Sequence, residues 1–153
     1  MKYTVAVEID LPLPEVIELF DDPDNWPKWR DGFVSAELLR GSPGEEESLT
    51  KLINRVVGGR NTEMTERVEH KNLPEEMTCV YVAPGYWFGA WNRVTNRFRE
   101  LKSNKTEWEF ESEFRCTGLL KVMSILTPGM FRSASLKEMN NFKDFAEGYQ
   151  SDA

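Results

Sequence analysis

From Gly32 onward the chain is a succession of strand-like segments joined by linkers of a few residues, and this feature limits the possible folds most strongly. Apolar and polar residues alternate within the segments, which is typical of half-buried strands. Gly, Pro and Asn separate them. Neighbouring parallel strands need a crossover of about a dozen residues, so linkers this short predict antiparallel pairing. The expected strands are 33–40, 46–57, 61–71, 76–83, 87–101 and 105–117.

The alternation is clearest in the last of these segments. Its inward side is predicted to hold Thr106, Trp108, Phe110, Ser112, Phe114 and Cys116. The other side carries four glutamates, and the preceding strand offers Arg93, Arg97 and Arg99 at matching positions. We interpret these charges as a solvated cross-strand ladder and not as an acidic binding surface. The same parity turns Asn92, Val94, Asn96 and Phe98 inward.

The remaining elements complete an α+β pattern. A first strand is expected at 2–9, followed by two short helices that begin near Pro14 and Pro23. A long helix is expected from Thr127-Pro128, with one apolar stripe. The stripe consists of Phe131, Ala134, Ser135, Met139, Phe142, Phe145, Ala146 and Tyr149. We therefore expect one domain over 1–153, with 148–153 as a flexible tail: a curved antiparallel sheet of about seven strands wrapped around the C-terminal helix.

Composition excludes several classes of function. A net charge of -7 on 153 residues opposes binding to nucleic acid. No signal peptide and no bilayer-spanning segment is visible, so we expect a cytoplasmic protein. One histidine and two distant cysteines, Cys79 and Cys116, argue against a metal site and predict free thiols. No phosphate-binding or nucleophile motif is present, and no cofactor is expected. A catalytic dyad of His70 with either cysteine is less favoured than an ordinary surface histidine.

The order of elements, together with five local motifs, resembles a known superfamily over residues 2–147. The motifs are Leu13-Pro14-Glu15-Val16, Asp22 to Trp29 followed by Gly32, Gly41-Ser42-Pro43-Gly44, Thr106-Glu107-Trp108 and Phe142 to Glu147. The chain resembles the START-related, Bet v 1-like helix-grip domains, specifically the bacterial polyketide cyclase/dehydrase and lipid-transport group often called SRPBCC. The resemblance implies a space between sheet and long helix that holds lipids, sterols, quinones or polyketides. These motifs make turns, caps and packing contacts, so they do not identify a reaction.

Two carboxylates are predicted to face the interior. Glu66 shares a strand face with Met64 and Val68, and Glu138 lies within the apolar stripe of the long helix. A buried carboxylate has a raised pKa and can act as a general acid or base. Otherwise each one pairs with an arginine such as Arg55, or reaches solvent at the cavity mouth.

The first hypothesis is therefore a binding or transport protein for a small hydrophobic molecule such as a lipid, quinone or polyketide. Its expected ligand-binding residues are Glu66, Asn92, Asn96, Phe98, Trp108, Phe110, Ser112, Phe114, Phe131, Ser135, Met139 and Phe142. Tyr81 and Trp87 are expected at the entrance. A cyclase, dehydratase or isomerase using Glu66 or Glu138 is the second hypothesis. A third is a packed interaction module without a ligand, docking through exposed aromatics such as Trp26, Trp87 or Trp91. The sequence predicts no oligomeric state.

Overall fold

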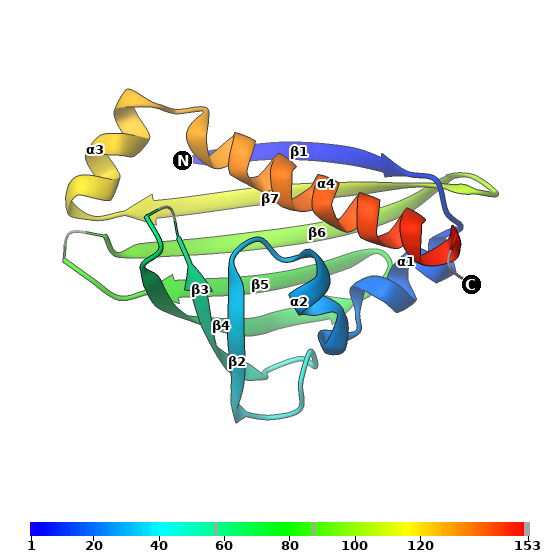
Figure 1. The fold of residues 1–153 in the computed structure, drawn as a ribbon, viewed down its shortest axis with the longest axis horizontal. Coiled ribbons are helices and arrows are strands. Elements are labelled where there is room, and N and C mark those ends of the chain that lie inside the picture. The colour runs from blue at the N-terminus through cyan, green and yellow to red at the C-terminus, as the bar shows by residue number, and fades with distance from the viewer. Residues whose placement is uncertain (57, 87, 152–153) are drawn as a thin grey trace.

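The computed structural model describes residues 1–56, 58–86 and 88–151 and contains seven strands and a long C-terminal helix (Figure 1). The chain begins with β1 (Lys2–Ile9), the helices α1 (Leu13–Phe20) and α2 (Trp26–Trp29), and a 3-10 turn at Pro23–Asn25 between them. The following strands are β2 (Phe33–Arg40), β3 (Leu49–Arg55), β4 (Asn61–Asn72), β5 (Glu76–Ala83), β6 (Ala90–Lys102) and β7 (Lys105–Cys116). Two helices, α3 (Gly118–Leu126) and α4 (Met130–Ser151), end the described chain.

The strands form one antiparallel sheet in the order β1-β7-β6-β5-β4-β3-β2. The register places Arg99 opposite Glu107 and Arg97 opposite Glu109, as the parity of the two strands predicted. The Arg99 guanidinium is 2.8 Å from the Glu107 carboxylate. The charged ladder is therefore on the outer face of the sheet, and the opposite face of β6 and β7 turns to the interior.

Helix α4 lies across the concave side of the sheet, with α1 and α2 between the two at one end (Figure 1). This arrangement confirms the expected α+β helix-grip architecture. On the inner side, Met139, Phe142 and Ala146 of α4 are at most 1% exposed. They pack with apolar side chains of the sheet and of α1 and α2 into one core.

The C-terminal third differs from the expectation in two places. Residues 118–126, to which the sequence analysis assigned no element, form α3. Thr127 makes the last helical bond of α3, its N–H donating to the Met123 carbonyl at 2.9 Å. The helix ends there because Pro128 follows and has no N–H to continue it, and α4 begins at Met130. Helix α4 extends to Ser151. Tyr149 continues the aromatic stripe there, with its ring centre 5.9 Å from that of Phe145.

Candidate functional site

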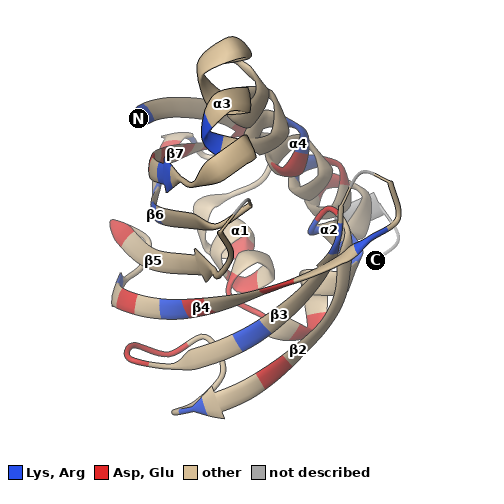
Figure 2. Ribbon diagram, turned by 90° about the vertical axis from the view of Figure 1, so that its left-hand side faces the viewer, with Lys and Arg blue, Asp and Glu red and all other residues tan. Residues whose placement is uncertain are grey.

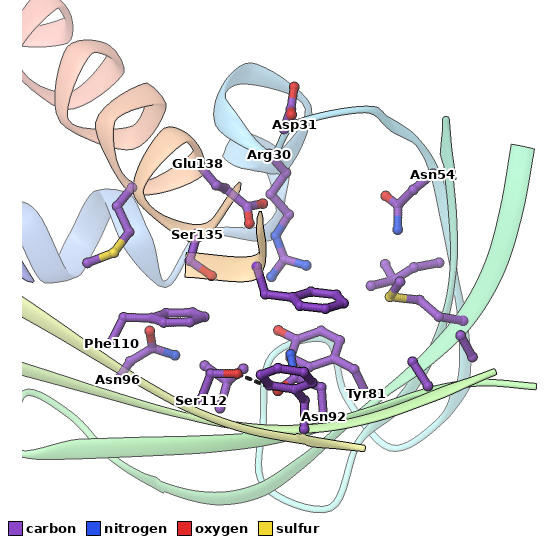
Figure 3. A pocket seen from close by; sticks show the side chains of 18 of the residues that line it. Arg30, Asp31, Asn54, Tyr81, Asn92, Asn96, Phe110, Ser112, Ser135 and Glu138 are labelled. Atoms are coloured by element: carbon purple, nitrogen blue, oxygen red, sulfur yellow. Dashed lines mark hydrogen bonds between the residues drawn. The ribbon is translucent and has the colours of Figure 1, made fainter. Parts of the chain in front are cut away.

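A cavity of about 490 Å³ separates the sheet from the first half of α4 (Figure 3). Its walls come mainly from β3–β7 and α4, with Trp29, Arg30 and Asp31 at one side. A volume of about 300–1,000 Å³ is typical of small-molecule sites. The interior of the fold is therefore not completely filled by its own side chains.

Ten of the residues predicted as catalytic candidates or ligand contacts line this cavity. They are Asn92, Asn96, Trp108, Phe110, Ser112, Phe114, Phe131, Ser135, Glu138 and Met139. Tyr81, expected at the entrance, also lines it, whereas Trp87 lies outside the described residues.

Three predicted ligand contacts, Glu66, Phe98 and Phe142, are not part of the cavity wall. Phe98 and Phe142 belong instead to an aromatic cluster that fills the space on the α1 and α2 side. Trp108 is central to this cluster, with ring centres 5.7 Å from Phe98 and 5.4 Å from Phe142. Phe20 and Trp29 from the short helices complete it. The sequence pattern shows only that these two phenylalanines face inward, and this does not separate the filled half of the interior from the hollow half.

Several polar side chains of the cavity wall form hydrogen bonds with other side chains of the protein. Ser112 donates to the Asn92 side-chain oxygen at 2.7 Å, and Asn96 accepts from the Trp108 indole at 2.9 Å. On α4, the Ser135 hydroxyl is 2.5 Å from the Tyr3 hydroxyl. These pairs satisfy buried groups and hold the wall in place.

Arg30 provides a cation at the edge of the cavity (Figure 3). Its Nη1 donates to the Glu66 carboxylate at 3.1 Å, and both side chains are mostly buried, with 16% and 4% exposed. The guanidinium also lies over the Trp26 ring, 4.1 Å from its centre. Burial opposes the charged form, but Glu66, Tyr81 and Glu138 together raise the pKa of Arg30. Glu66 thus pairs with an arginine, as one of the two alternatives to an acid-base role stated, but this arginine is Arg30 and not the Arg55 given there as an example.

Local structure fixes the position of Arg30. It follows the single turn of α2, and its N–H donates to the Trp26 carbonyl at 2.9 Å. Gly32 then turns the chain into β2 with φ +70°, and a Cβ at this position would lie 2.3 Å from the Arg55 carbonyl oxygen. Only glycine fits this close approach. The tight turn therefore sets Arg30 between the sheet and α4.

Glu138 is the predicted carboxylate that does line the cavity. It projects from α4 toward Arg30 (Figure 3). Burial raises the pKa of Glu138, and although Arg30 lowers it in part, the net direction is upward. A carboxyl group with a raised pKa beside a guanidinium can donate a proton to a ligand oxygen, or accept one from it.

Replacing Glu138 by glutamine is expected to stabilise the protein more at pH 7 than at pH 4. The folded chain holds this proton more tightly than the unfolded chain, because the pKa is raised above its ordinary value of 4.5. Ionisation of Glu138 therefore lowers the stability of the wild type as the pH rises above 4.5, and glutamine removes this loss. Melting temperatures of both proteins across this pH range test the prediction. Glu18→Gln, at an exposed site, controls for the lost charge. A difference between Glu138→Gln and the wild type that does not change with pH would contradict it.

Arg30 is the main site residue that the sequence analysis missed. It follows a short Trp-rich segment in which no periodic pattern marks a buried position. The only signal for it was indirect, because an inward-facing Glu66 requires a counter-ion.

Two of the tryptophans considered for docking, and both thiols considered for catalysis, make contacts within the described part of the fold. Trp26 is only 7% exposed, and the Arg115 guanidinium lies 5.1 Å from the Trp91 ring centre. Cys79 and Cys116 are free thiols, and burial raises the pKa of both. A raised pKa disfavours the thiolate that a catalytic dyad with His70 would need.

Within the described residues no group of His, Cys, Asp and Glu side chains is arranged to hold a metal ion. No helix in the described ranges has both the length and the apolar character needed to cross a bilayer.

Comparison with protein families identifies the chain. Residues 1–147 match the family described as polyketide cyclase / dehydrase and lipid transport. The protein belongs to this family. No curated protein sequence gives a significant match to this polyketide cyclase/dehydrase family member.

Solved structures share the fold of this family member at low sequence identity. A conserved protein from Geobacillus kaustophilus superposes with a TM-score of 0.82 at 12% identity, covering 95% of each chain. Zhui aromatase/cyclase from Streptomyces sp. R1128 has a TM-score of 0.78 at 14% identity, covering 96% of this chain and 93% of its own. Ara h 8.0201 has a TM-score of 0.74 at 13% identity, covering 100% and 99%. These likenesses show the Bet v 1-like helix-grip fold.

Proposed function

We propose that the protein binds a small, mostly apolar molecule in the cavity and that an oxygen atom of this molecule faces Arg30. The observation that carries the proposal is the cavity of about 490 Å³ between sheet and α4. Apolar walls such as Phe110, Phe114 and Phe131 would supply affinity through buried apolar area. The described hydrogen bond of Arg30 uses one of its five N–H donors, so a carbonyl or carboxylate oxygen is the complementary ligand group.

The family also supports this proposal, because its description names lipid transport beside polyketide cyclisation. Binding is preferred over catalysis for a structural reason. Glu66, one of the two carboxylates considered for acid-base chemistry, is held by Arg30 and lies outside the cavity wall. Glu138 alone remains as a titratable carboxylate of the predicted pair in contact with the cavity.

Native mass spectrometry of the protein purified from cells tests the proposal. We expect a bound small molecule in the wild type and its loss in Ala90→Phe, because Ala90 lines the cavity and a benzyl group would occupy the ligand space. Ala36→Phe makes the same change on the exposed face of β2 and should retain the ligand. The proposal fails if the wild type carries no ligand and also binds nothing from panels of lipids, quinones and aromatic polyketides.

The second candidate is a cyclase or dehydratase in which Glu138 exchanges a proton with the substrate. It is favoured by the raised pKa of Glu138 and by its position beside Arg30, whose charge would stabilise a developing oxyanion. Glu138→Gln should then reduce turnover of any accepted substrate by about 10²–10⁴-fold while binding persists. Unchanged turnover in both Glu138→Gln and Glu66→Gln would exclude acid-base catalysis by these residues.

A further inference from the structure

Helix α3 presents its apolar side chains to solvent. A surface helix normally buries its apolar face and exposes polar residues. In α3 the buried residue is Ser124, at 3% exposed. The large side chains on the outside, here called the α3 surface, are Leu119, Val122, Met123, Ile125 and Leu126. Contiguous exposed apolar residues of this kind mark a site that another surface covers.

The α3 surface is continuous with the rim of the cavity. Cys116, two residues before α3, and Phe131, in the first turn of α4, both line the cavity. The Thr117 hydroxyl donates to the Gly85 carbonyl at 2.9 Å and accepts from the Gly89 N–H at 3.1 Å. These bonds join α3 to the turn between β5 and β6, where Phe88 is 52% exposed. The two segments therefore form one apolar edge beside the cavity mouth.

The charge of this part of the chain is opposite to that of the whole. The protein has a net charge of -7, yet no Asp or Glu occurs between Glu113 and Glu138. Four basic residues lie in this interval: Arg115, Lys121, Arg132 and Lys137. Figure 2 shows α3 at one end of the molecule, with no acidic segment on it.

Two of these cations already have acidic neighbours. Arg115 lies 3.9 Å from Glu113, and Lys137 lies 3.2 Å from Asp31. Among the described residues no acidic group pairs with Lys121 or Arg132. Their charge is therefore available to a partner that approaches the α3 surface.

We propose that the α3 surface docks the protein on an anionic lipid bilayer. Apolar side chains flanked by Lys and Arg are complementary to one leaflet of such a bilayer. The apolar side chains would enter its acyl boundary, and the basic side chains would contact its negative headgroups. A second copy of the chain is a poorer partner, because a two-fold contact would bring Lys121 and Arg132 of both copies together. The acidic remainder of the protein does not prevent docking, since salt screens charges beyond about 8 Å at physiological ionic strength. This docking goes beyond the proposed ligand binding and does not depend on it.

Vesicle flotation of the full chain tests the proposal. The probes are phosphatidylcholine vesicles with about 30 mol% phosphatidylglycerol, and vesicles of phosphatidylcholine alone. We expect the bound fraction of wild type to be at least about fivefold higher on the anionic vesicles and to fall with added salt. The variant Ile125→Glu/Leu126→Glu should bind them roughly tenfold less, because it places charges where the acyl boundary would lie.

Leu38→Glu/Leu39→Glu is the matched control. It also adds two negative charges at exposed leucines, but on β2, at the opposite end of the molecule from α3 (Figure 2). It should bind like the wild type, and melting curves should show both variants folded. Equal loss in the two variants would overturn the proposal, since net charge alone would then explain binding. A wild type that does not float with anionic vesicles would also overturn it. In that case light scattering shows whether a second copy covers the α3 surface. The wild type would then be a dimer, and Ile125→Glu/Leu126→Glu would be a monomer.

Discussion

Replacing Arg30 by methionine is expected to lower the free energy of unfolding by about 3–5 kcal/mol. The Glu66 side chain is 4% exposed, and its carboxylate lies 3.1 Å from the Arg30 guanidinium. Removal of the guanidinium therefore leaves a buried acid without a counter-ion. Methionine retains an apolar stem of similar length against Trp26. The loss should therefore arise mainly from the unpaired charge. Urea unfolding at pH 7, followed by circular dichroism, measures it.

The double variant Arg30→Met/Glu66→Leu separates the effect of the unpaired charge from the effect of lost packing around Arg30. With both charges of this pair removed, Glu66 no longer lacks its counter-ion, and stability is expected to return to within about 1 kcal/mol of the wild type. If the single variant costs less than about 1 kcal/mol, water already solvates Glu66 and the description of the pair as buried is wrong. If the double variant is as unstable as the single one, packing of Arg30 on Trp26 matters more than its charge.

The sheet could be predicted from the sequence because the alternation of apolar and polar residues within a strand indicates which of its faces is buried. In β7 the alternation of Trp108, Phe110 and Phe114 with glutamates has one solution, since a shift by one residue would bury the acids. Short linkers then leave antiparallel pairing as the only connection. Local pattern and overall topology therefore agree, and the helix-grip architecture follows.

Arg30 could not be predicted in the same way. An arginine after a short Trp-rich helix has no local signal for burial, and arginine is usually exposed. Its position depends on Glu66, which is 36 residues away in the chain, and on the turn at Gly32. The interpretation with Arg55 was the nearest one open to sequence reasoning, because Arg55 lies on the neighbouring strand. Long-range packing of α2 against the sheet decides between the two.

The boundary between the filled and the hollow part of the interior also could not be predicted from the sequence. Phe131 and Phe142 both belong to the apolar stripe of α4, and periodicity treats them alike. In the structure Phe142 is fully buried among Phe20, Trp29 and Trp108, whereas Phe131 lines the cavity near Phe114. Two identical substitutions on one helix can therefore measure how complete the core is at each end.

Phe142→Ala is expected to lower the free energy of unfolding by about 3–5 kcal/mol, and Phe131→Ala by only about 1 kcal/mol. The first change opens a new void inside the aromatic cluster, where neighbouring rings lie 5.1–5.8 Å away and cannot collapse into it. The second enlarges a space that already exists, so it loses little beyond the contact with Phe114. Urea unfolding of both variants under the same conditions measures the difference.

The same pair of variants connects stability to the cavity. Phe131→Ala should weaken binding of the co-purified ligand while the protein remains well folded, because it removes part of the proposed binding wall. Phe142→Ala should leave the affinity of the folded fraction unchanged, since its ring does not reach the cavity. Equal losses of stability would mean that the Phe131 end is as closely packed as the Phe142 end. The hollow near the start of α4 would then be too small for a ligand, and the binding and catalytic proposals would both fail.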